Sequence, residues 1–134
     1  MFAPDFVFAP EAYEQFKASP QLAHIWLVPN PEHNPGGVFC LSTDGLALNL
    51  PKLTTAATGA EPVRYTFSTI ALYKRAFFEA AWCPIPAGNP SGVKAPLAAM
   101  LRAAMDNDAV SASLYSGACT DVGSPERLAQ LNAV

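Results

Sequence analysis

The chain has 134 residues, of which 51% are hydrophobic and 14% are charged, against about 25% charged in a typical soluble domain. This composition argues against a disordered chain, because disordered chains are rich in charge and poor in apolar residues. Eight basic residues against eleven acidic ones give a net charge of -3, which argues against nucleic-acid binding through a basic surface.

Membrane insertion and secretion are equally unexpected. No apolar run reaches the roughly 20 residues that span a bilayer, and residues 1–5 carry no basic segment typical of a signal peptide. Cys40, Cys83 and Cys119 have neither zinc-ligand spacing nor a disulfide pattern. We therefore expect a cytoplasmic protein. The low charge also predicts that another chain, or a further part of the protein, covers some of its surface.

The first part of the chain predicts a helix, a buried strand and a hairpin. Pro10 and the acidic residues after it predict a helix over 10–19. A nearly continuous apolar run predicts a strand over 22–28 that is buried on both faces. A loop with proline and glycine breakers follows. Asp44-Gly45 between the apolar runs 38–42 and 46–50 then predicts a β-hairpin.

The rest of the chain continues this alternation of helices and strands. In order, we expect an irregular connection (51–62), a strand (63–73), a short helix (74–81), a loop (84–96), a helix opened by Pro96, a strand (110–115) and a helix capped by Ser124 with Pro125 in its first turn. Helices that alternate with buried strands predict a single α/β domain with a mixed sheet and flanking helices.

Few residues indicate chemistry by themselves. The sequence has no G-x-G-x-x-G, Walker or G-x-S-x-G motif. His24 lies in an apolar run and is expected to be a core or strand-edge histidine, whereas His33 lies in a polar loop and is expected to be solvent-exposed. Cys119 is expected in an apolar strand context, and Cys83 has no basic neighbour that would lower its thiol pKa. Asp121 follows the last predicted strand, where α/β sheets bind ligands, but Asp before Gly123 is also typical of a turn.

Four segments become informative when they are taken in order. They are Asn30-Pro31 with Gly36-Gly37-Val38-Phe39, then Tyr65-Thr66-Phe67-Ser68-Thr69-Ile70, then Lys94-Ala95-Pro96-Leu97, and finally Asp121-Val122-Gly123-Ser124-Pro125-Glu126-Arg127-Leu128. Together they resemble the C-terminal part of the sugar-1-phosphate nucleotidyltransferases, and among these the compact N-acetylmuramate 1-phosphate uridylyltransferases. The resemblance extends from about Leu22 to Leu131, and its last segment is the most specific.

This resemblance implies a Rossmann-like nucleotidyltransferase fold that joins a nucleoside triphosphate to a sugar 1-phosphate and releases pyrophosphate. It makes Asp121 a catalytic carboxylate and a ligand of Mg²⁺, which binds one or two carboxylates beside phosphate oxygens. Lys94 would contact the sugar phosphate, or it is a solvated loop lysine. The remaining expected substrate-binding residues are Asn30, Gly36, Gly37, Thr66 and Ser68.

Some features depart from the family. The nucleotide-binding N-terminal half, with its Gly-rich loop and second metal-binding Asp, has no counterpart, so we expect residues 1–134 to be the sugar-acceptor half and to be inactive alone. Thr69 stands where the family usually has Gly, and Cys119 stands near a common aromatic position. An exposed sheet edge predicts a homo-oligomer. The alternative is a non-catalytic module that binds a sugar phosphate or serves in assembly.

Overall fold

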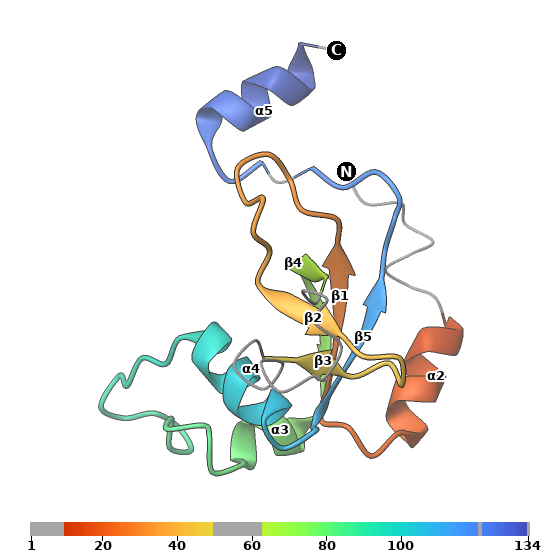
Figure 1. Cartoon of the computed structure of the whole chain (residues 1–134). Coiled ribbons are helices and arrows are strands. Elements are labelled where there is room, and N and C mark those ends of the chain that lie inside the picture. Colours follow the sequence, from red (N-terminus) through yellow and green to blue (C-terminus); the bar gives the residue numbers. More distant parts are fainter. Residues whose placement is uncertain (1–9, 50–62, 121, 134) are drawn as a thin grey trace.

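The computed structural model describes residues 10–49, 63–120 and 122–133, which form one sheet of five strands with helices around it (Figure 1). The elements are α2 (Pro10–Ala18), β1 (Ala23–Val28), β2 (Phe39–Leu41), β3 (Ala47–Leu48), β4 (Arg64–Tyr73), α3 (Arg75–Glu79), α4 (Leu97–Met105), β5 (Val110–Leu114) and α5 (Pro125–Asn132). The expected α/β class is confirmed. The expected connection over 51–62 lies outside the described residues.

The sheet has the strand order β3-β2-β4-β1-β5, with β4 at its centre and β1 between β4 and β5. Strand β1 pairs parallel with β5 and antiparallel with β4, so the sheet is mixed, as the sequence predicts. Ala23, Ile25 and Leu27 of β1 are fully buried, and the alternate residues Trp26 and Val28 are 7% exposed. The prediction that this strand is buried on both faces is therefore confirmed.

The predicted hairpin is formed by β2 and β3. The Ser42 N–H donates to the Leu46 carbonyl, and Gly45 adopts a φ of 81°, a left-handed conformation that glycine reaches without strain. The Gly45 carbonyl in turn accepts a hydrogen bond of 2.9 Å from the N–H of Ala112 on β5. This contact covers part of the outer edge of β5. Self-association through a sheet edge stays a prediction.

The two faces of the sheet are covered by different helices. Phe77 of α3 and Leu101 of α4 pack in one core cluster with the β1 residues Ala23 and Ile25. His24, whose side chain alternates to the other face, lies against Phe16 of α2 with ring centroids 6.3 Å apart. The sheet is thus held between α2 on one side and α3 with α4 on the other.

Other differences from the sequence-based expectations are local. Helix α3 is shorter than the expected 74–81, and β5 ends at Leu114, so Cys119 lies in a coil and not in the apolar strand context expected for it. Helix α5 forms as predicted, but Leu128 and Leu131 on its apolar face are 47% and 38% exposed. In the described part of the chain, no helix has the length and apolar character needed to cross a membrane.

Candidate functional site

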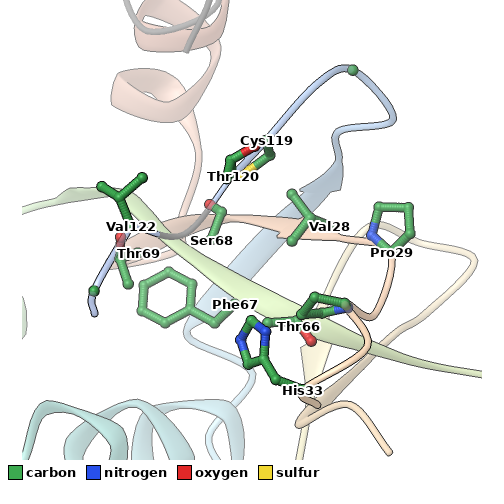
Figure 2. A pocket seen from close by; sticks show the side chains of 13 residues that line it. Val28, Pro29, His33, Thr66, Phe67, Ser68, Thr69, Cys119, Thr120 and Val122 are labelled. Carbon is green, nitrogen blue, oxygen red and sulfur yellow. The ribbon is translucent and has the colours of Figure 1, made fainter. Parts of the chain in front are cut away.

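A cavity of about 500 Å³ opens beyond the C-terminal end of β1 (Figure 2). In open α/β sheets, this end of the strands is where ligands bind. Three segments that are distant in the sequence form the walls, namely the end of β1 with its following loop, the middle of β4, and the coil after β5. The described lining residues are Val28, Pro29, Pro31, His33, Thr66, Phe67, Ser68, Thr69, Gly117, Cys119, Thr120, Val122 and Gly123.

The β4 wall is shaped by a bulge. The register of β1 and β4 shifts between Ile25, which faces Ala71, and Leu27, which faces Phe67, so residues 68–70 lie opposite Trp26 alone. At this point the Ser68 hydroxyl donates a hydrogen bond of 2.7 Å to the Trp26 carbonyl. Extra residues in one strand bend it and change where side chains point. All of residues 66–69 therefore line the cavity, although consecutive side chains of a regular strand alternate between faces.

Thr69 occupies the centre of this bulge with a strained backbone. Its φ is 69°, in the left-handed region that β-branched residues rarely enter. Its side chain is exposed on the cavity wall, and Figure 2 shows it on the β4 ribbon. Strain of this kind costs about 1–3 kcal/mol and is found most often at functional sites.

The loop after β1 is held against β4 by amide and hydroxyl groups. The Asn30 Nδ2 group donates to the Arg64 carbonyl at 2.9 Å, and its Oδ1 accepts from the Thr66 hydroxyl at 3.0 Å. The same Thr66 oxygen accepts from the Asn34 amide at 3.1 Å. Asn30 and Thr66 therefore fix the shape of the loop that carries Pro31 and His33 to the cavity.

Gly37 is required by this packing. It has a φ of 62°, and a Cβ atom there would lie 2.8 Å from both the Arg64 Cβ and the Asn30 Oδ1. Around Gly36, in contrast, a Cβ atom would meet nothing within 4 Å. The close approach that Gly37 permits in this structure is to β4 and to Asn30.

The coil after β5 supplies the third wall and leads into α5. A side chain at Gly117 would collide with the ring of Tyr115, so this turn favours glycine. The Ser124 side chain caps α5 by accepting from the Arg127 N–H at 3.3 Å. The Arg127 Nη1 lies 3.3 Å from the His33 Nε2, so the first turn of α5 touches the loop after β1.

The described part of the cavity wall carries few ionisable side chains. It has no aspartate, glutamate, lysine or arginine, and its polar side chains are hydroxyls, one thiol and the His33 imidazole. Glu126 lies outside the wall, where hydrogen bonds from its own backbone N–H and from Ser124 lower the pKa of its carboxyl. Burial raises the pKa of the Cys40 thiol, whereas Cys119 is only partly buried in the wall.

The described residues show no ligand set for a metal ion. They include no group of three or more histidine, cysteine, aspartate or glutamate side chains that could hold one. Asp121, to which the motif assigns Mg²⁺, lies outside the described residues. The magnesium site therefore stays a prediction.

The structure brings some of the expected substrate-binding residues together. Thr66 and Ser68 line the cavity, and Asn30, Gly36 and Gly37 lie in the adjoining loop. Lys94 is exposed in the coil before α4 and is not among the residues that line the cavity.

No sequence pattern singles out Thr120 or Cys119 as ligand-facing, and His33, which is exposed in its loop as expected, also lines the cavity. These side chains reach the wall through the coil after β5 and the loop after β1, whose paths no periodic pattern indicates. Thr69 did carry a signal, because it stands where the resembled family usually has glycine, and the structure gives it a glycine-like φ.

Comparison with known proteins agrees with the motifs. The chain is 33% identical over 112 residues to N-acetylmuramate alpha-1-phosphate uridylyltransferase of Neisseria meningitidis serogroup B (strain ATCC BAA-335 / MC58). The match covers 84% of this chain and 42% of that protein, so the chain spans less than half the length of this relative. No family model matches the chain. The expected resemblance is therefore confirmed, and the chain is a relative of a sugar-1-phosphate nucleotidyltransferase, the uridylyltransferase of N-acetylmuramate α-1-phosphate, over part of that protein's length.

Proposed function

We propose that this chain forms the sugar-acceptor side of a sugar-1-phosphate nucleotidyltransferase, with N-acetylmuramate α-1-phosphate as its sugar substrate. The observation that carries the proposal is the way two motif segments meet. The segment from Thr66 to Ile70 and the segment that begins at Asp121 are far apart in the sequence, yet residues of both wall one cavity. The relative's name supplies the reaction class, a uridylyltransferase acting on a sugar phosphate.

The cavity has the size and chemistry for a sugar ring. Small-molecule sites are typically about 300–1,000 Å³, mostly apolar, with a few placed polar groups, and this cavity measures about 500 Å³. Phe67, Val28 and Val122 can pack against the C–H faces of a ring, while threonine hydroxyls meet its polar edge. A described wall without aspartate, glutamate, lysine or arginine side chains suits the ring better than the phosphate. The phosphate would then lie outside this part of the wall.

The proposed roles for the charged substrate groups rest on Asp121 and on a second polypeptide or segment. Asp121 stands in the sequence between two lining residues, Thr120 and Val122. We propose that its carboxylate binds Mg²⁺, which would neutralise phosphate charge during transfer, as in phosphoryl transfer generally. The triphosphate would be held by a part that corresponds to the unmatched portion of the relative, so the isolated chain is proposed to be inactive.

Binding can be located with the chain's own cysteines. Cys119 lies in the cavity wall, whereas Cys83 is partly buried in a different part of the surface. Bound N-acetylmuramate α-1-phosphate should slow alkylation of Cys119 and leave alkylation of Cys83 unchanged, as measured by peptide mass spectrometry. Equal rates at Cys119 with and without saturating sugar phosphate would contradict the proposal.

Turnover tests the catalytic part of the proposal. With UTP, Mg²⁺ and a nucleotide-binding half from a related enzyme, pyrophosphate release should appear, and Asp121→Asn should remove most of it. If the sugar phosphate slows alkylation of Cys119 but the chain never supports turnover, the chain would be a non-catalytic sugar-phosphate-binding module. The observation that favours this second candidate is that the described wall has no aspartate, glutamate, lysine or arginine side chain.

A further inference from the structure

Two hydroxyl groups in the cavity are not used by the fold. Within the described ranges, the hydroxyls of Thr69 and Thr120 have no hydrogen-bond partner, although both residues line the cavity. The hydroxyls of Ser68 and Thr66, in contrast, are bonded to the Trp26 carbonyl and to the Asn30 side chain. The hydroxyls of Thr66 and Ser68 thus hold the wall together, whereas those of Thr69 and Thr120 are available to a ligand.

The two available hydroxyls come from different segments. Thr69 lies on β4, and Thr120 lies on the coil that follows β5 (Figure 2). A ligand that bonds to both must therefore span the cavity between these walls. Each hydroxyl can donate one hydrogen bond and accept others, which matches a ligand whose own polar groups are hydroxyls.

The backbone of Thr69 is strained, so the fold places this side chain on the cavity wall at a cost in free energy. The bulge opposite Trp26 and the φ of 69° carry Thr69 onto the cavity wall together with residues 66–68. Nothing in the described packing requires a β-branched side chain there, because Thr69 is exposed. A glycine would relieve the strain, but it would remove both the hydroxyl and the methyl group from the wall.

We propose that Thr69 is a specificity-determining residue of this cavity, and that its hydroxyl, together with that of Thr120, hydrogen-bonds to ring hydroxyls of the bound sugar. This inference rests on the proposed function and names the side chains that recognise the sugar. Thr69 places a side chain on the cavity wall where glycine would have none, so this chain should accept a smaller set of sugar phosphates than a form with glycine at this position.

Isosteric variants test the hydroxyls separately from shape and strain. Thr69→Val and Thr120→Val each remove a hydroxyl and keep the branched shape, and Thr69→Val keeps the strained φ. Thr43→Val is the matched control, because Thr43 is exposed in the β2–β3 turn and is not among the residues that line the cavity. Affinity of the full chain for N-acetylmuramate α-1-phosphate is measured by calorimetry, and folding is checked by circular dichroism.

The loss of one hydrogen bond predicts that Thr69→Val and Thr120→Val each weaken binding about three- to tenfold, whereas Thr43→Val leaves it unchanged. If the native chain binds and neither cavity variant weakens binding, this inference is overturned and the proposed function stands. If the native chain binds no sugar phosphate, the proposed function and the inference fall together. Should Thr69→Val not fold, Thr69→Gly removes the same hydroxyl without backbone strain, and unchanged binding in that variant overturns the inference.

Discussion

Ser68 and Trp26 are joined across the sheet by a side chain that bonds to a backbone group. The Ser68 hydroxyl donates to the Trp26 carbonyl at 2.7 Å, and the Ser68 Oγ atom accepts from the Ile70 N–H at 3.2 Å. The contact lies where the register between β1 and β4 shifts. The buried Ser68 side chain there makes the hydrogen bonds that backbone groups would make in a regular β-ladder. Ser68 thereby stabilises the bulge that displays Thr69.

Replacement of Ser68 by alanine should therefore destabilise the fold. The change leaves a buried carbonyl and an amide N–H without the hydroxyl, at a cost of about 1–3 kcal/mol in the free energy of unfolding. Urea denaturation measures this difference. Ser116→Ala is the control, because Ser116 is exposed in the coil after β5 and surface changes usually alter stability by less than about 0.5 kcal/mol. Equal unfolding midpoints for the two variants would contradict the structural role of Ser68.

The paired glycines give a second prediction with its own control. Gly37→Ala places a Cβ atom 2.8 Å from the Arg64 Cβ and the Asn30 Oδ1 at a φ of 62°, so it should lower stability by about 2 kcal/mol or more. Gly36→Ala, with open space around the new atom, should be nearly neutral. Both variants are compared by urea denaturation. Similar losses for both would show that Gly37 is not confined as described.

The sequence predicts the elements of this fold well, because their signals are local. The proline that opens α2, the Asp-Gly hairpin and the Ser124 cap each act over a few residues, and all of these elements form near their expected bounds. The continuous apolar run of β1 likewise predicts a strand buried on both faces. Such signals depend on backbone preference and burial, which a single segment carries in its own composition.

The cavity is less predictable, because it depends on register. Nothing in the residues 66–70 shows that β4 carries extra residues opposite Trp26, since the bulge arises from how two strands pair. The motif therefore indicated Thr66 and Ser68, whose hydroxyls the fold uses, and passed over Thr69 and Thr120. The position of Lys94 outside the cavity wall also depends on the path of a long coil that has no periodic pattern.

Tyr73 offers a site where a substitution should increase stability. Its hydroxyl is buried, and it has no hydrogen-bond partner within the described ranges, while its ring packs against Phe77 and Phe78. Burial also raises the pKa of this hydroxyl. Tyr73→Phe keeps the ring contacts and removes the unpaired group, so the unfolding free energy should rise by about 1 kcal/mol. Tyr13→Phe on the exposed face of α2 is the matched control and should change little.

His24 predicts how the stability of the chain depends on pH. Its ring lies between β5 and α2, with Nδ1 2.8 Å from the Ser111 hydroxyl and Nε2 3.1 Å from the Ser113 hydroxyl. Burial lowers the pKa of His24 below the ordinary value of 6.5. The unfolded chain therefore takes up a proton near pH 6.5, while the folded chain stays neutral until a lower pH.

Because the unfolded state binds more protons in that interval, the folded state should lose stability as the pH falls below about 6.5 and recover it as the pH rises again. The melting temperature, measured from pH 8 to about pH 5, should decline, and His24→Gln should flatten the decline while lowering the melting temperature at neutral pH. A native slope that persists in His24→Gln would assign the pH dependence to other groups.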